Sequence, residues 1–152
     1  MSSQEVKFEI KELSVLEISD FFKVHDNDYF EKLSDRVNIN EYSEKLLESS
    51  IQFTLWDNVN LIGLSPCYFN NVEEKVGYIS SLTIKEGFRG RKLGSKLIAR
   101  ISEYAKEHGF NVVMVKIHYL NEMSHQFYKK NGFTDFIADK ENAFRLLRLE
   151  VE

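Results

Sequence analysis

The chain has 152 residues, of which 43% are hydrophobic and 13% aromatic, so we expect a single globular domain over residues 1–152. No apolar run approaches a membrane span, the N-terminus lacks the apolar stretch of a secretory signal, and the one cysteine, Cys67, cannot form an internal disulfide. The formal net charge of −4 argues against a general nucleic-acid-binding protein; we expect neither nucleic acid nor membrane as partner, and the cytoplasm as location.

The first predicted elements are a strand and an amphipathic helix. Residues Val6–Ile10 alternate between apolar and polar side chains, which is typical of a strand with one buried face. Ser14 and Glu17 have the spacing of a capping box, so a helix should begin near residue 15. Its apolar side recurs at helical spacing and comprises Ile18, Phe21, Phe22 and His25.

The next segment is less regular. Residues 28–39 show no clear period and receive no assignment. Asn40 is predicted to cap a second helix, because asparagine is favoured at the N-cap and an amphipathic run follows it. The apolar stripe of that helix comprises Tyr42, Leu46 and Leu47.

Three strands are predicted in the middle of the chain. Residues 51–56 and 61–69 are rich in β-formers and flank a short polar turn. Pro66 cannot donate to a ladder, so it predicts a bulge or an edge within the second of these strands. Residues 76–84 form the third strand, and together the three predict an antiparallel meander.

A strand, a helix and another strand follow with the pattern of a βαβ unit. The strand at 76–84 leads through a basic turn, residues 85–92, into an amphipathic helix at 93–107. Residues 112–117 are nearly unbroken β-branched residues, which predicts a strand buried on both faces. The crossover between the two parallel strands should be right-handed.

The C-terminal part should hold a short helix and two closing strands. Asn121 is predicted to cap the helix, and Asn131 with Gly132 should end it. Strands are expected at 133–137 and 144–151. The fold class is therefore α/β in the α+β sense, with a mixed, mostly antiparallel sheet and one parallel βαβ unit.

The basic turn is the strongest candidate for a binding site. Residues 85–96 contain five basic side chains against one acid, a net charge of +4 within an acidic chain. A turn at a helix N-terminus presents unpaired backbone N–H groups and the positive end of the helix dipole. This combination predicts a phosphorylated small ligand.

Two motifs resemble those of the GNAT superfamily, the acyl-CoA-dependent N-acetyltransferases. The family signature Gln/Arg-x-x-Gly-x-Gly/Ala matches the residues from Arg89 to Gly94, and a second pattern matches Asn121 followed by Tyr128-Lys129-Lys130-Asn131-Gly132-Phe133. The resemblance covers about residues 50–137. It implies a V-shaped splay between the two parallel strands of the sheet, and helices on both faces of the sheet.

The resemblance also implies a site for acetyl-CoA as acyl donor. The strand before the turn would hold the pantetheine arm and the thioester oxygen, and the turn would hold the pyrophosphate. The implied cofactor-binding residues are Leu82, Thr83, Ile84, Arg89, Gly90, Arg91, Lys92, Leu93, Gly94, Ser95 and Asn121. Lys92 departs from the pattern, because most members have glycine there; a left-handed lysine would cost about 1–2 kcal/mol.

Tyr128 is the implied general acid, because a phenol with a pKa of about 10 suits protonation of a leaving thiolate. The alternative is that Tyr128 simply packs on the core. The general base is not readable: Tyr78 stands where many members have glutamate, and His118, at a strand end, is the candidate. Cys67 is expected to be a buried apolar residue, and four scattered histidines do not form a metal site, so no metal is expected.

The expected function is transfer of an acetyl group from acetyl-CoA to a primary amine of a small molecule, by direct attack. The acceptor could be an amino sugar, an amino acid or a polyamine, bound between residues 26–40 and the turn near 139–142, because loops carry specificity. A protein or peptide amine is the alternative acceptor, and a CoA-binding sensor without turnover is the alternative of another class. A homodimer stays open.

Overall fold

The structure is a computed structural model that describes residues 5–151. The chain forms two compact units. The first comprises the chain up to Cys67 together with Ser81–Leu97, and the second comprises Tyr68–Ser80 and the chain from Ile98 onward. The single domain expected over residues 1–152 stays a prediction.

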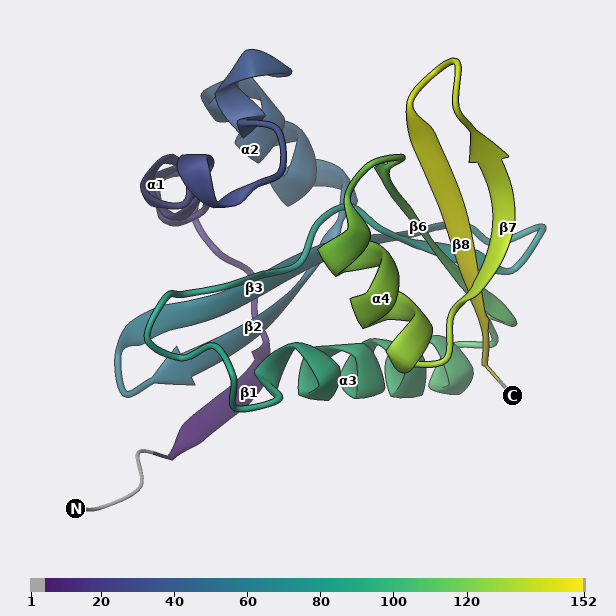
Figure 1. The fold of residues 1–152 in the computed structure, drawn as a ribbon. Coiled ribbons are helices and arrows are strands. Elements are labelled where there is room, and N and C mark those ends of the chain that lie inside the picture. The colour runs from purple at the N-terminus through teal and green to yellow at the C-terminus, as the bar shows by residue number, and fades with distance from the viewer. Residues whose placement is uncertain (1–4, 152) are drawn as a thin grey trace. The chain divides into compact units, whose positions relative to one another are not determined.

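The first unit contains strands and helices from the N-terminal half, coloured purple to teal in Figure 1. Its elements are β1 (Val6–Ile10), α1 (Val15–Val24), η1 (Asp26–Asp28), η2 (Leu33–Asp35), α2 (Ile39–Ser49), β2 (Ile51–Asp57), most of β3 (Asn60–Asn71), and β5 (Thr83–Ile84). β2 pairs antiparallel with β1 on one side and with β3 on the other, and β5 pairs antiparallel with β3.

The helices of this unit begin at side-chain caps. The Ser14 and Glu17 capping box is confirmed, with the Glu17 N–H donating to Ser14 Oγ at 3.1 Å and the Ser14 N–H donating to Glu17 Oε1 at 3.0 Å. The predicted cap of the second helix is wrong: Asn38 accepts from the Glu41 N–H at 3.0 Å, and Asn40 lies inside the first turn. Asn38 and Asn40 are both good caps by type, and the extended backbone of residue 38 decides between them.

The prediction of a bulge or an edge at Pro66 is also wrong, because no register shift occurs there and β3 is an inner strand of the sheet. Pro66 lies opposite Gln52 in continuous register, and the shift falls between Leu55 and Trp56. Pro66 is tolerated within a long strand because β5 pairs only with Gly63 and Leu64, so the missing N–H falls outside that ladder.

The single strand predicted over 76–84 is interrupted. It consists of β4 (Val76–Ile79) and β5, which are separated by three residues outside regular structure. β4 pairs in parallel with β6 (Val112–His118), and this pairing ends at Ile79, whereas β5 pairs with β3. The sequence alone gives no signal for this break, because the residues between the two strands are compatible with a strand.

The second unit contains the parallel pair and the closing hairpin. Besides β4 and β6 it holds α4 (Glu122–Lys130), β7 (Thr134–Asp139) and β8 (Phe144–Glu150), and α3 (Leu93–Glu107) begins in the first unit and continues in the second. Figure 1 shows β8 beside β7 at the yellow end of the chain, and β8 also pairs antiparallel with β6. In β6 only Val113, Val115 and Ile117 are buried, so the prediction of burial on both faces is wrong.

The fold class is confirmed as mixed α/β. The hydrogen-bonded strand order is β1-β2-β3-β4-β6-β8-β7, with β5 on β3. Within residues 5–151, β4 and β6 form a parallel pair in this mostly antiparallel sheet. The placement of helices on both faces, and the V-shaped splay, stay predictions. Among the same residues, no helix has the length and apolarity required to cross a bilayer.

Candidate functional site

The turn between β5 and α3 adopts an unusual backbone conformation. Three of its residues have positive φ angles: Gly87 at 93°, Gly90 at 81° and Lys92 at 60°. A Cβ added at Gly87 or Gly90 would meet no atom within 4 Å, so glycine is favoured there by the backbone angle and not by lack of space. Lys92 therefore has a left-handed backbone at the position where most members of the GNAT superfamily, which the motifs resemble, have glycine.

This backbone directs polar groups toward one end of α3. Turns that alternate right- and left-handed residues form concave arrays of N–H groups that suit anions. The helix starts at Leu93, and its first ordinary bond runs from the Lys96 N–H to the Lys92 carbonyl at 3.1 Å. The N–H groups of Leu93, Gly94 and Ser95 therefore precede the first repeating bond of the helix. Leu93 itself is buried and can offer a ligand only its backbone.

The pairing of β5 divides the predicted pantetheine-binding residues into two sets. The Lys85 N–H donates to the Ile62 carbonyl at 2.8 Å, and the register continues with Gly63 opposite Ile84 and Leu64 opposite Thr83. Because backbone groups alternate in direction along an antiparallel strand, Thr83 directs its own toward β3. Leu82 and Ile84 direct theirs away from β3. Because the Ile84 carbonyl accepts from Arg89 Nε, the groups left to meet a ligand are those of Leu82 and the Ile84 N–H.

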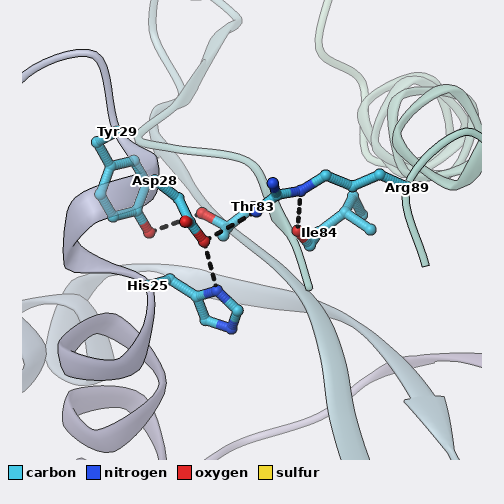
Figure 2. A network of polar contacts seen from close by, with 6 residues as sticks. All are labelled: His25, Asp28, Tyr29, Thr83, Ile84 and Arg89. Atoms are coloured by element: carbon cyan, nitrogen blue, oxygen red, sulfur yellow. Dashed lines mark hydrogen bonds and ion pairs between the residues drawn. The ribbon is translucent and has the colours of Figure 1, made fainter. Parts of the chain in front are cut away.

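Arg89, the first residue of the signature, makes two contacts within the first unit (Figure 2). Its Nε donates to the Ile84 carbonyl at 2.9 Å, and its Nη2 donates to Asp28 Oδ2 at 2.8 Å. The same oxygen accepts from His25 Nδ1 at 2.8 Å. The hydrogen bond from His25, together with the charge and hydrogen bond of Arg89, holds the pKa of the Asp28 carboxyl below its usual range.

A second contact links the same two segments. The Tyr29 hydroxyl lies 2.7 Å from Thr83 Oγ1, and Thr83 is buried. Burial raises the pKa of the Tyr29 phenol far above its ordinary value, so this hydroxyl stays protonated at neutral pH. Tyr29 is therefore a structural hydrogen-bonding group and no candidate for a base.

In the second unit, α4 carries two of the predicted site residues. Asn121 caps the helix as predicted: its Oδ1 accepts from the Ser124 N–H at 3.1 Å and its Nδ2 donates to Ser124 Oγ at 2.9 Å. Tyr128 is 6% exposed, and its ring packs edge-on against Phe127 and Phe133 with centroid distances of 5.1 Å. The ring thus packs on the core, as in the alternative interpretation, and the predicted role of its hydroxyl as general acid stays a prediction.

His118 ends β6 as predicted, but its hydrogen bond weighs against the role of general base. The Leu120 N–H donates to His118 Nδ1 at 3.0 Å, so this nitrogen is an acceptor. A neutral imidazole that accepts at Nδ1 carries its proton on Nε2. The basic nitrogen is therefore Nδ1, and it could take up a proton only by losing the bond from the Leu120 N–H.

Other reactive groups are accounted for by burial. Cys67 is fully buried, and burial raises the pKa of its thiol to about 12, so it packs as a small residue and is not a nucleophile. Tyr78 is half-buried on β4. Within residues 5–151, no three histidine, cysteine or carboxylate side chains lie close enough to hold a metal ion.

The structure places the predicted cofactor-binding and catalytic residues in two groups. Residues 82–95 lie together in the first unit, and Asn121, Tyr128 and His118 lie in the second. The partners that the sequence did not predict are His25, Asp28 and Tyr29. Asp28 contacts Arg89 of the turn, His25 bonds to Asp28, and Tyr29 contacts Thr83 on β5. The acidic cluster after the first predicted helix carried no signal of a partner 61 residues away.

A mixed sheet with a basic, left-handed turn leading into a helix N-terminus is an arrangement suited to a phosphorylated ligand. The family model of the acetyltransferase (GNAT) family matches residues 11–133, and the chain belongs to that family.

Relatives and solved structures agree with this assignment. Over 78 residues, 49% of this chain, it is 32% identical to an uncharacterized N-acetyltransferase of Methanocaldococcus jannaschii, and the match spans only 34% of that protein. The fold is similar to PaiA N-acetyltransferase of Thermoplasma acidophilum in complex with coenzyme A, with a TM-score of 0.74, 20% identity and coverage of 95% and 99% of the two chains. The fold is also similar to an acetyltransferase of Bacillus subtilis in complex with CoA, with a TM-score of 0.74, 16% identity, and coverage of 97% of this chain and 100% of the other.

Proposed function

We propose that this protein transfers an acetyl group from acetyl-CoA to a primary amine of a small molecule by direct attack. The observation that carries the proposal is the turn from Lys85 to Lys92, which combines three left-handed residues with a net charge of +4 over residues 85–96, directly before α3. Phosphate oxygens are suited to backbone N–H groups at such a position. The two CoA complexes among the similar structures support the choice of ligand.

The residues present fit coenzyme A in two further respects. The backbone groups of Leu82 and the Ile84 N–H point away from β3, where an extended amide chain such as pantetheine could bind them. Ser81, just before them, has a buried hydroxyl oxygen without a hydrogen-bond partner in the described part of the chain. Buried polar groups usually have partners, so this hydroxyl supports a ligand that supplies one.

The chain's own residues would contribute binding and proton transfer. Acetyl-CoA supplies the activated acetyl group when bound. Arg91, Lys92 and Lys96 offer positive charge to its phosphates, and the N–H groups from Leu93 to Ser95 offer donors. Tyr128 holds a proton at its hydroxyl, which suits it to protonate a leaving thiolate. The amine must arrive neutral, and the hydrogen bond at His118 Nδ1 favours a water as the proton acceptor over this histidine.

The proposal is tested by binding and by turnover. Isothermal titration with CoA should show one site, and replacing Arg91 with alanine should weaken it by removing a charge from the turn. Release of free thiol from acetyl-CoA should then depend on an added amine, drawn from amino sugars, amino acids and polyamines. Thiol release with a lysine-containing peptide but with no small amine would replace the small-molecule acceptor by a protein one.

A CoA-binding sensor is the second candidate. Two observations favour it: Tyr78 occupies the position where many family members have glutamate, and His118 uses Nδ1 as an acceptor. A sensor would bind CoA by calorimetry and release no thiol with any amine in the panel. Turnover with one small amine is enough to exclude it.

A further inference from the structure

The Asp28 carboxylate lies where a negative charge should harm an anion site. Asp28 is held against the turn that carries a net charge of +4 over residues 85–96. By charge alone it would repel phosphate and compete with it for Arg89. Its side chain is 32% exposed, so water does not fully screen this effect. Its presence therefore requires a compensating role.

The geometry of Arg89 supplies that role. The planar guanidinium spans two fixed points, the Ile84 carbonyl at the end of β5 and Asp28 Oδ2 at the end of η1 (Figure 2). Arg89 lies between Gly87 and Gly90, two of the left-handed residues of the turn. Since the guanidinium is rigid and bonded at two places, it restrains the backbone of the turn at its centre.

Asp28 is itself held firmly. His25 Nδ1 donates to the same carboxylate oxygen at 2.8 Å, and the buried His25 ring packs on Phe21 with a centroid distance of 4.4 Å. The next residue, Tyr29, bonds to Thr83 on β5. Two adjacent residues thus tie the end of η1 to both β5 and the turn.

The segment between α1 and α2 is also held together by its own hydrogen bonds. Asp26 accepts from the Ser34 N–H at 2.9 Å and from the Ser34 hydroxyl at 2.6 Å, which joins η1 to η2. The segment between α1 and α2 is therefore a braced platform and not a free loop. This makes it suited to hold another segment in place.

We propose that Asp28 is a positioning residue for the CoA-binding turn: through Arg89 it holds the turn in its left-handed conformation, and it takes up the Arg89 charge in doing so. The inference rests on the proposed function, because it assigns Asp28 a role in binding CoA without contact to it. It also assigns the phosphate charges to Arg91, Lys92 and Lys96, and not to Arg89.

Two substitutions separate positioning from charge. Asp28→Asn removes a negative charge beside the turn, so a purely electrostatic role predicts tighter CoA binding, whereas positioning predicts weaker binding. Arg89→Lys keeps the positive charge but cannot reach both Ile84 and Asp28 with one planar group, so charge alone predicts no change and positioning predicts weaker binding. Asp35→Asn, on the exposed η2 of the same segment, is the matched control for loss of one negative charge.

The measurement is calorimetric titration of CoA into each full-length variant, with a thermal scan without ligand to check the fold. We expect Asp28→Asn and Arg89→Lys each to weaken CoA binding by about tenfold, or about 1.4 kcal/mol. The double variant should bind CoA about as well as the single variant with the lower affinity, because both substitutions break the same contact. Asp35→Asn should stay within about twofold of the wild type.

Each other result is decisive. Wild-type protein that binds no CoA overturns the proposed function and this inference together. If the wild type binds CoA, equal or tighter binding by Asp28→Asn than by Asp35→Asn overturns the inference alone, as does additive loss in the double variant. Should Asp28→Asn not fold, Arg89→Lys decides: wild-type affinity overturns the inference, and a tenfold loss with an unchanged unfolding midpoint supports it.

Discussion

Lys92→Gly should stabilise the protein, although it removes the whole side chain. The φ angle of Lys92 is 60°, in the region that non-glycine residues occupy at a cost of about 1–2 kcal/mol. Glycine removes this strain but gains freedom in the unfolded chain, which costs about 0.4–1 kcal/mol. The net gain is about 0.5–1 kcal/mol, and for a chain of this length it raises the unfolding midpoint by about 1–4 °C.

The control is Lys85→Gly, another exposed lysine of the same turn. Lys85 does not have a positive φ, so there is no backbone strain for glycine to relieve. Glycine there brings only the entropic cost and should lower the unfolding midpoint. Both substitutions remove one positive charge, so the charge effect cancels in the comparison. Thermal unfolding without ligand is the assay. A midpoint for Lys92→Gly at or below that of Lys85→Gly would refute the strain argument.

The same variant tests whether Lys92 helps to bind the cofactor. We expect CoA affinity of Lys92→Gly to be unchanged or weaker, because the left-handed backbone persists while one charge is lost. Calorimetry measures it. A tenfold gain in affinity, about 1.4 kcal/mol, would show that lysine at this position is a defect of the site.

The remaining predictions concern the second unit. Tyr128→Phe keeps the packed ring and should lower kcat by about 10²–10⁴ with little change in the KM for acetyl-CoA; an unchanged kcat, with no burst of product in the wild type, returns the residue to packing. Asn121→Ala removes the cap on the Ser124 N–H and should cost about 0.5–2 kcal/mol in urea unfolding, and an unchanged midpoint would contradict the cap's contribution. Gly77→Ala places a Cβ in steric conflict with Phe69 Cε1, and the overpacking should cost about 1–3 kcal/mol; stability equal to the wild type would mean that this ring moves aside without cost.

Local patterns predicted most of the elements. The capping box at Ser14, the strand Val6–Ile10 and the helix Leu93–Glu107 were predictable because caps and periodicity act over a few residues. The predicted N-cap of the second helix was wrong by two residues, since Asn38 and Asn40 satisfy the same local rule. Motifs predicted the turn as a ligand site, and Lys92 was flagged there as a departure from glycine.

What the sequence by itself determined is most of the elements, the position of the basic turn and the family, because each depends on residues close in the chain. Only the tertiary structure decided that residues 76–84 divide between two different partner strands, since pairing partners are chosen across the sheet. It also decided that Arg89 pairs with Asp28, 61 residues away. An ion pair forms where folding brings two charges together, and the local sequence around either residue does not indicate its partner.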